Sequence, residues 1–407
     1  MKTVQQILKQ INNFFDTSTL AGLMKSYEVI KRKREIEPSA FLKALLKNSL
    51  KSEVSISDIV ESLYKDDKIS ISRPAMHKKL LKCENLFIEL LNQLLNKKNI
   101  TNGNCRKFKG LDDILILDGS TINKNKKIQV IYSNFQQKIV NIDVTESNKN
   151  DQSYKNHLDH IAPSQLLVAD LAYFCVDSFR KIKEKGAFFL SRYFKTTSLW
   201  KSKETKIDLN DFLAKQEENE IDIPVLIGSS KLLGRLICIR LNPKDKVKRA
   251  INLAKKRFKD RRLKIINLEW DGWNIFVTNL PKTKFEAGLC YEIYASRWQV
   301  ELLFKAMKSK CLNISKTIYN TALGKIMFYC KLLVAVLIFI LRGQKNNDIS
   351  ITKLFKVTSG ILLNNIHKIG SWSLLFIRKI RHVIDKFCKS SRYKSRLSSF
   401  ERVNGYA

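Results

Sequence analysis

Hydrophobic residues recur every three or four positions over the first quarter of the chain. In FLKALLKNSL (41–50) and LFIELLNQLL (86–95) this spacing places the apolar side chains on one face of a helix. Residues 1 to 107 carry no long runs of β-branched residues. We therefore predict a helical N-terminal domain over residues 1–107.

Within that domain, residues 55–83 predict two helices joined by a polar turn. The first begins at a Ser/Asp pair, and the second opens with Ser-Arg-Pro and is basic. This order is compatible with a helix-turn-helix that binds DNA, and a plain helical hairpin fits almost equally well because no spacing here is diagnostic. The basic second helix favours DNA slightly.

From residue 113 onward, continuous apolar runs replace the helical spacing. DILILDGSTI (113–122) is typical of a central strand that is buried on both faces. The segments that follow predict two strands joined by the short NFQQ turn, a polar helical stretch, a strand, a helix and a strand: KIQVIYS (127–133), KIVNIDVT (138–145), SYKNHLDHI (153–161), LLVAD (166–170), VDSFRKIKEKG (176–186) and AFFLSRYF (187–194). Three strands, helix, strand, helix, strand resembles the order of an RNase H-like core, an α/β fold with a mixed sheet flanked by helices.

A second strand-rich stretch, over about residues 197–280, reads as a β-rich insertion. It holds IDIPVLIG and GRLICIRLNP, one basic helix over 244–262, and a hairpin at Asp271-Gly272 that joins INLEW to NIFVTNL. A long helix is then predicted from about Ala287. We place the catalytic domain at 108–315 and a basic helical C-terminal region at 316–407, for which dimerisation is the candidate role.

The charge of the chain limits the class of partner. Lys and Arg number 74 against 38 Asp and Glu among 407 residues, a formal net charge of +36. Such a charge is expected on a protein that binds a polyanion, either nucleic acid or an anionic membrane. Membrane is the weaker candidate, because the longest uncharged apolar run, Leu332 to Leu341, is far shorter than the ~20 residues of a membrane span and predicts a buried core helix. The N-terminus lacks a secretory apolar segment, so we expect an intracellular protein.

Candidate chemistry rests on carboxylates. The eight cysteines contain no C-x-x-C pair, and the His157/His160 pair has no cysteine at zinc-finger spacing. Asp118 and Asp170 each close an apolar strand, where a charge is costly unless it is paired or bound to a metal ion. Taken singly, either aspartate is more simply a strand-end turn residue.

A third carboxylate, Glu301, belongs to a polar stripe on the long helix. Tyr294, Arg297, Glu301 and Lys308 lie at offsets 0, 3, 7 and 14, which is a stripe ~60° wide on a helix, and Lys305 extends it. Most of the remaining circumference is apolar. The stripe therefore predicts a specific polar ligand, with a row of structural ion pairs as the alternative.

These motifs carry a resemblance to a known family. LDGST (117–121), LLVADLAYF (166–174), TNLP (278–281) and the Y-x2-R-x3-E-x6-K spacing of residues 294–308 resemble the DDE transposases of bacterial insertion sequences with the Y-R-E-K signature. The resemblance spans roughly residues 70 to 315. The second motif departs from the family pattern, since Asp-Leu-Ala-Tyr stands where members often have Asp-Arg-Gly-Tyr.

The resemblance implies a site and a reaction. Asp118, Asp170 and Glu301 would be the catalytic residues and would bind two Mg²⁺ ions, with Mn²⁺ as a substitute, to cut and join DNA through a hairpin intermediate. The residues implied in contacts to phosphates and a flipped base are Tyr294, Arg297, Lys305, Lys308, Trp298 and Trp273. Core packing is the alternative for both tryptophans, and more so for Trp273.

The implied partners are the terminal inverted repeats, the target DNA and a second copy of the chain on DNA, in the bacterial cytoplasm at the nucleoid. Two alternatives stay open: an RNase H-like nuclease without strand transfer, and a non-catalytic DNA-binding regulator derived from a transposase. The Tyr/Arg/Lys stripe favours transposition over hydrolysis alone. The three intact acids argue against a regulator.

Overall fold

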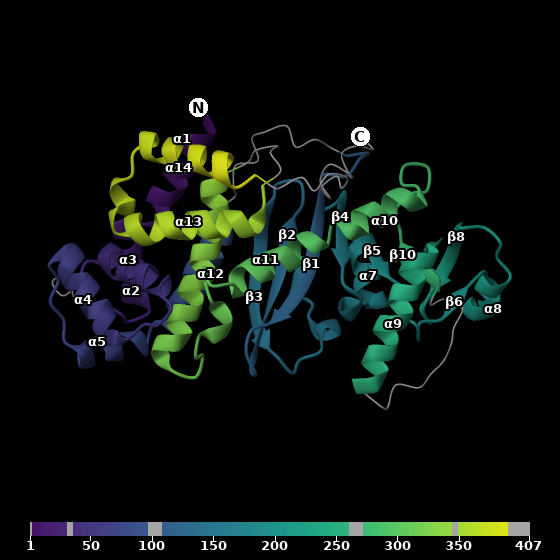
Figure 1. The fold of residues 1–407 in the computed structure, drawn as a ribbon, viewed down its shortest axis with the longest axis horizontal. Coiled ribbons are helices and arrows are strands. Elements are labelled where there is room, and N and C mark those ends of the chain that lie inside the picture. Colours follow the sequence, from purple (N-terminus) through teal and green to yellow (C-terminus); the bar gives the residue numbers. More distant parts are fainter. Residues whose placement is uncertain (1, 31–35, 97–107, 260–271, 344–348, 390–407) are drawn as a thin grey trace.

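One large sheet forms the centre of the protein, with a body of helices packed beside it (Figure 1). The computed structural model describes residues 2–30, 36–96, 108–259, 272–343 and 349–389. The sheet has the strand order β3-β2-β1-β4-β5-β10-β9-β8-β6-β7. Its strands are β1 (Asp113–Thr121), β2 (Lys126–Ser133), β3 (Lys138–Glu146), β4 (Gln165–Ala169), β5 (Phe188–Arg192), β6 (Leu199–Trp200), β7 (Lys206–Ile207), β8 (Glu220–Ile227), β9 (Leu232–Arg240) and β10 (Trp273–Thr278).

The first five strands form the RNase H-like core predicted from the sequence. β1 pairs antiparallel with β2, and β2 pairs antiparallel with β3 across the short predicted turn. On its other side β1 is parallel to β4, and β4 is parallel to β5. The mixed sheet is therefore confirmed, and the parallel neighbours bring the carboxyl ends of β1 and β4 to the same edge.

The β-rich insertion extends this sheet. β10 pairs antiparallel with β5 on one side and with β9 on the other, and β8, β6 and β7 follow outward. INLEW and Asp271 of the predicted hairpin lie outside the described residues. The basic helix of the insertion is present as α9 (Pro243–Lys259), after the short α8 (Leu209–Ala214).

One predicted helix within the core is wrong. SYKNHLDHI contains no α-helix, and instead two short 3₁₀ turns, η1 (Asp151–Ser153) and η2 (Asn156–His160), connect β3 to β4. Tyr154 and Lys155 separate the turns, and Tyr154 is extended, with φ −73° and ψ 112°. A helix cannot continue through such a residue. The next predicted helix is present as α7 (Val176–Glu184).

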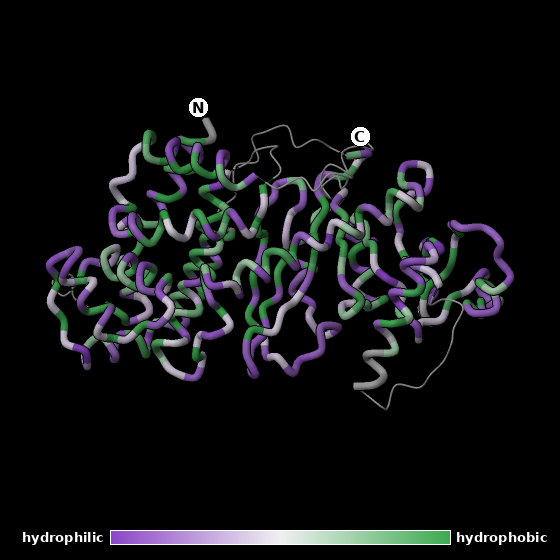
Figure 2. The backbone as a smooth tube through the Cα atoms, viewed as in Figure 1, coloured by the Kyte–Doolittle hydropathy of each residue, from purple (hydrophilic) through white to green (hydrophobic). Residues whose placement is uncertain are grey.

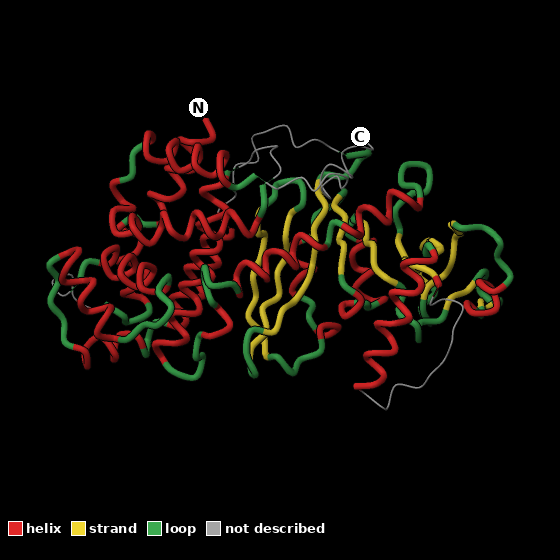
Figure 3. Tube along the Cα trace, viewed as in Figure 1, coloured by secondary structure: helices red, strands yellow, loops and turns green. Residues whose placement is uncertain are grey.

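The helices at the two ends of the chain share one hydrophobic core. Side chains from the first 96 residues pack in a single cluster with side chains from residues 300–388. Figure 3 shows these helices gathered on one side of the sheet. They are α1 (Lys2–Phe14), α2 (Thr17–Ser26), α3 (Pro38–Ser49), α4 (Ile56–Asp67), α5 (Arg73–Leu80), α6 (Glu84–Asn96), α12 (Ala322–Arg342), α13 (Ile351–Asn365) and α14 (Leu374–Phe387).

α12 is the central helix of this body. Its 21 residues are long and apolar enough for a membrane span by composition, but 83% of its most apolar window is buried inside the protein. It contacts α3 and α6 from the N-terminal part and α13 and α14 from the C-terminal part. The apolar colouring of Figure 2 continues from α12 into these neighbours. The buried core helix predicted around Leu332–Leu341 is confirmed.

Candidate active site

Asp118 and Asp170 lie next to each other at one edge of the sheet. In the parallel pairing of β1 with β4, Leu117 is opposite Ala169, so the next residue of each strand is an aspartate. Asp118 follows Ile114 and Ile116 on the face of β1 that α11 (Trp298–Lys308) contacts. Its residue exposure is only 9%, whereas the Asp170 side chain is 36% exposed.

Arg297 joins these aspartates to Glu301. Its Nη1 donates to Oδ2 of Asp118 at 2.7 Å, and its Nη2 donates to Oε1 of Glu301 at 2.6 Å. Its Nε lies 4.0 Å from Oδ1 of Asp170. One guanidinium therefore lies among all three predicted acids, although they come from two strands and a helix.

A break in the predicted long helix places Arg297 there. The chain forms α10 (Ala287–Ala295) and α11 instead of one helix from Ala287. At the junction, the amides of Arg297, Gln299 and Val300 each bond a carbonyl three residues back rather than four. The break tightens the backbone by 3₁₀-type turns, so the stripe calculated for one straight helix does not hold across Ser296–Arg297.

Burial controls the electrostatics of the site. It raises the pKa of Asp118 to about 6, while Arg297 and the amide of Gly119 lower that pKa and the other two acids raise it. Burial also opposes the charge on Arg297, but Tyr294 and the three acids outweigh it and raise the pKa of the guanidinium. Arg297 is thus held as a cation among carboxylates.

The donor set fits a divalent metal ion in its chemistry. Three carboxylates surround one positive charge, and oxygen ligands of this kind suit Mg²⁺. As the side chains stand, no group of three His, Cys, Asp or Glu in the described chain is spaced to hold an ion, and Arg297 lies between these acids. Metal binding at Asp118, Asp170 and Glu301 therefore requires the guanidinium to move out.

The other residues of the predicted stripe lie in different surroundings. Tyr294 is 8% exposed and packs against Phe276, with ring centroids 5.0 Å apart, and the Arg297 guanidinium lies 6.0 Å from its ring centre. It forms a wall of the site. Lys305 is exposed and Lys308 is half-buried, both on α11.

The two candidate tryptophans differ sharply. Trp298, at the start of α11, is 58% exposed and accessible to a partner. Trp273 is 3% exposed within a hydrophobic core cluster, with the Arg240 guanidinium 4.5 Å from its ring centre. Its placement supports the core-packing alternative, because a base cannot stack on a ring that is already covered.

Behind Asp118 lies a contact that sequence reasoning did not identify. A Cβ on Gly119 would lie 2.4 Å from the Tyr173 hydroxyl and 2.5 Å from Oε1 of Gln129. The Tyr173 hydroxyl donates to that same oxygen, and Nε2 of Gln129 donates to Asp151 at 2.9 Å. The tyrosine of the second motif thus packs directly under the residue after Asp118. The signal available in the sequence was a glycine inside a strand, which often marks a close approach.

Arg192 is a second residue that sequence reasoning missed. It is exposed at the end of β5, the strand beside β4, and its guanidinium lies 5.9 Å from the Tyr294 ring centre. Its Nη2 also donates a long hydrogen bond to Oδ1 of Asn274 at 3.5 Å. The sequence signal was again positional, since Arg192 is the last residue of a buried strand and Asp170 directly follows one.

Comparison with known proteins identifies the same region. The family described as "Transposase DDE domain" matches residues 109–337, which is more than half of the chain and includes all three acids. A transposase for insertion sequence element IS1151 from Clostridium perfringens is 27% identical over 360 residues, covering 76% of this chain and 74% of that protein. A transposase for IS231F from Bacillus thuringiensis subsp. israelensis is 27% identical over 204 residues, covering 45% and 43%.

A solved structure also aligns along most of the chain. The piggyBac transposase synaptic complex with hairpin DNA covers 98% of this chain and 85% of the other, at a TM-score of 0.42 and 9% identity.

Proposed function

The chain belongs to the transposase DDE domain family, and from this premise we propose that it excises and inserts an insertion sequence by cut and paste through a hairpin intermediate. The observation that carries the proposal is the meeting of Asp118, Asp170 and Glu301 around Arg297. These acids come from β1, the end of β4 and α11. No protein nucleophile is needed, because water or a DNA 3′-hydroxyl attacks phosphorus.

In this proposal the three acids bind two Mg²⁺ ions, which Mn²⁺ can replace. When bound, such ions supply activation of the attacking oxygen and stabilisation of the leaving 3′-oxygen. Arg297 then leaves the carboxylates and donates to a DNA phosphate, for which its planar fork is well suited. The guanidinium groups of Arg297 and Arg192 both approach the Tyr294 ring, and we place the DNA strand on this side of the site.

Residues of α11 hold the DNA strand during the reaction. Lys305 is exposed and Lys308 is half-buried, so both can reach backbone oxygens. Trp298 offers an exposed aromatic face at the start of the same helix. A base flipped out of the hairpin would stack on that face, which offsets part of the cost of unstacking it.

The N-terminal helices provide the recognition of the terminal repeats. α4 and α5 are joined by residues 68–72, and α5 begins after the N-cap Ser72, whose hydroxyl accepts from the amide of Ala75. Arg73, His77 and Lys78 are exposed on α5. We propose that this helix enters the DNA groove and that two copies assemble on paired ends inside the cell.

The test uses purified protein, Mg²⁺ and a duplex that carries the terminal repeat of its element. Hairpin-ended products are expected, followed by joining to target DNA. Products that are only nicked would identify a nuclease instead. Lys308→Ala should retain nicking and lose hairpin processing, and an equal loss of both steps would contradict the role given to Lys308.

A further inference from the structure

We propose that a cleft between the N-terminal helices and the start of α12 binds a phosphate group. The cleft has a volume of about 260 Å³ and is separate from the carboxylate site. One wall is the loop from α3 to α4, and the other runs from η5 (Ile314–Lys316) into the first turns of α12. Its polar and charged lining includes Asn48, Lys51, Glu53, Lys316, Thr321 and Lys331.

Lys331 gives the cleft a buried positive charge. It is 5% exposed, and its Nζ donates to the Asn313 carbonyl at 3.2 Å and to Oγ1 of Thr317 at 2.9 Å. Both acceptors are neutral, and no carboxylate in the described residues forms an ion pair with it. Burial without a counter-ion lowers the pKa of Lys331 to about 8. An anion in the cleft would offset that penalty.

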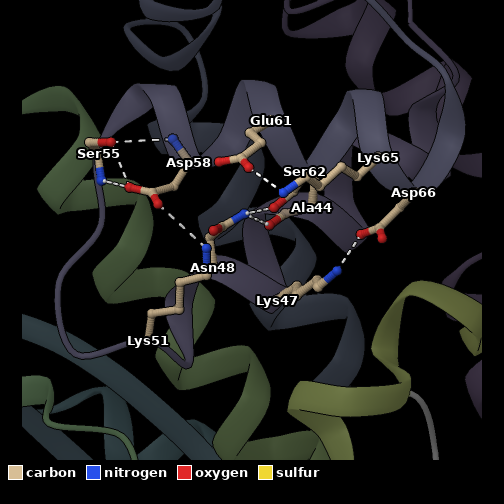
Figure 4. A network of polar contacts seen from close by, with 10 residues as sticks. All are labelled: Ala44, Lys47, Asn48, Lys51, Ser55, Asp58, Glu61, Ser62, Lys65 and Asp66. Carbon is tan, nitrogen blue, oxygen red and sulfur yellow. Dashed lines mark hydrogen bonds and ion pairs between the residues drawn. The ribbon is translucent and has the colours of Figure 1, made fainter.

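Two further lysines line the same cleft. Lys316 is exposed at one wall, and Lys51 lies at the other. Figure 4 shows Lys51 reaching toward Asp58, but its Nζ stays 3.5 Å from Oδ1, which is a loose ion pair. Glu53 is the only carboxylate among the lining residues, so three lysines against one glutamate give the lining a net charge of +2.

The N-terminus of α12 adds to this positive potential. Thr321 is its N-cap, with Oγ1 accepting from the Gly324 amide at 3.0 Å, and both residues line the cleft. The first turn of a helix carries unpaired amides and a partial positive charge that favour anions. A Cβ on Gly324 would lie 1.6 Å from the Ile318 carbonyl, so only glycine lets the preceding segment pack this closely.

Asn48 adds a buried hydrogen-bond acceptor to the lining of the cleft. Its side chain is fully buried, and Nδ2 donates to the Ala44 carbonyl and to Oγ of Ser62, each at 2.9 Å (Figure 4). Its Oδ1 has no partner among the described residues. Such an acceptor can hold a water or a protonated phosphate oxygen, whereas an apolar ligand would leave it unpaired.

Phosphate in the cleft could come from the DNA backbone or from solution. One wall of the cleft is the loop that leads into α4, one of the proposed repeat-binding helices, and this position favours the backbone of a bound transposon end. That assignment rests on the proposed function. The affinity of the cleft for phosphate does not.

The first experiment titrates inorganic phosphate into the full chain at constant ionic strength, with calorimetry and hydrogen exchange as readouts. We expect saturable binding that slows exchange in residues 48–54 and 316–324. Lys331→Met and Lys316→Met should each weaken binding at least about tenfold, because each removes one charge contact. Lys310→Met is the control, since Lys310 is exposed and lies outside the cleft.

Wild-type affinity in both cleft variants would overturn the proposal, as would the lack of saturable binding. Lys316 is exposed, so its variant keeps the test valid if Lys331→Met fails to fold. A second experiment identifies the source by competing inorganic phosphate against a terminal-repeat duplex. If phosphate and the duplex compete for the wild-type protein but not for Lys316→Met, the cleft binds the DNA backbone. If the duplex and phosphate bind the wild-type protein independently, the cleft binds free phosphate. Phosphate binding without any DNA cleavage would contradict the proposed function alone.

Discussion

Nη1 of Arg297 lies 2.7 Å from Oδ2 of Asp118, although the two residues are 179 positions apart in the chain. The same guanidinium donates to Glu301, so a side chain expected at the DNA backbone instead neutralises the acids. Arg297 can therefore compete with metal ions for the carboxylates. The competition arises because the helix breaks just before α11 and directs the arginine toward the edge of the sheet.

The acids should be required for cleavage and dispensable for DNA binding. Asp118→Asn, Asp170→Asn and Glu301→Gln each remove one charged oxygen ligand, and we expect cleavage to fall at least about 100-fold. Gel-shift affinity for the terminal repeat should change little. Asp177→Asn is a matched control, because that side chain is 75% exposed on α7. Normal cleavage by any of the three variants would disprove the site.

Removing the guanidinium should strengthen metal binding. Arg297→Gln takes away the cation that contacts Asp118 and Glu301, so the acids become more available. We expect Mn²⁺ to bind about tenfold more tightly, a gain of ~1.4 kcal/mol, in titrations followed by paramagnetic resonance without DNA. Arg192→Gln, which carries no ion pair to these acids, should bind Mn²⁺ as the wild type does. Unchanged affinity in Arg297→Gln would show that the guanidinium does not compete.

Gly119→Ala should displace Asp118 by crowding the Tyr173 hydroxyl that packs against Gly119. The added methyl group would lie 2.4 Å from the Tyr173 hydroxyl and 2.5 Å from Oε1 of Gln129, so either the strand or these two side chains must shift. We expect a loss of about 1–3 kcal/mol in stability by thermal unfolding, together with slower nicking. Tyr173→Phe removes that hydroxyl and should restore part of both. Gly288→Ala is the control, because nothing would lie within 4 Å of a Cβ at that position. If the effects of Gly119→Ala and Tyr173→Phe on stability simply add, the proposed contact between residue 119 and the Tyr173 hydroxyl is contradicted.

Substitution of Trp273 should reduce stability, whereas substitution of Trp298 should affect DNA binding and leave stability unchanged. Trp273→Ala empties a buried position and is expected to cost about 3–5 kcal/mol in the free energy of unfolding. Trp298→Ala removes a ring that is 58% exposed and should leave the unfolding midpoint nearly unchanged. With 2-aminopurine at the hairpin tip, Trp298→Ala should lose the fluorescence change that accompanies base stacking. A full fluorescence change in that variant would exclude the stacking role.

His157 should make the fold sensitive to acid. Burial lowers its pKa from 6.5 to about 4, and the charge of Lys155 acts in the same direction. A hydrogen bond to the Tyr154 backbone and the charge of Asp159 raise the pKa and offset part of this shift. Between these pH values the unfolded chain binds more protons than the folded one, so stability falls as pH drops from 6.5 toward 4. At pH 5 the loss is about 2 kcal/mol relative to pH 7. Urea unfolding of His157→Phe should show a pH 7 to pH 5 difference smaller by that amount, and an equal difference would assign the acid sensitivity to other groups.

Much of the core could be predicted from the sequence because its signals are local. The apolar runs that end in Asp118 and Asp170 predicted central strands with polar ends, and their parallel pairing is present. The uncharged run in α12 predicted a buried helix. The helix predicted over SYKNHLDHI was wrong because a polar stretch has no apolar periodicity to support a helix, and local turn geometry decided its structure.

By itself the sequence determined which residue types stand at which spacings: two strand-end aspartates, the Tyr/Arg/Glu/Lys pattern and the succession of strands and helices along the core. Only the tertiary structure decided that the insertion continues the same sheet, that Trp273 is buried while Trp298 is exposed, and that Arg297 contacts Asp118. The physical reason is distance along the chain. Periodicity reports the environment of neighbouring residues, whereas contacts across 179 positions depend on how the sheet and helices pack together.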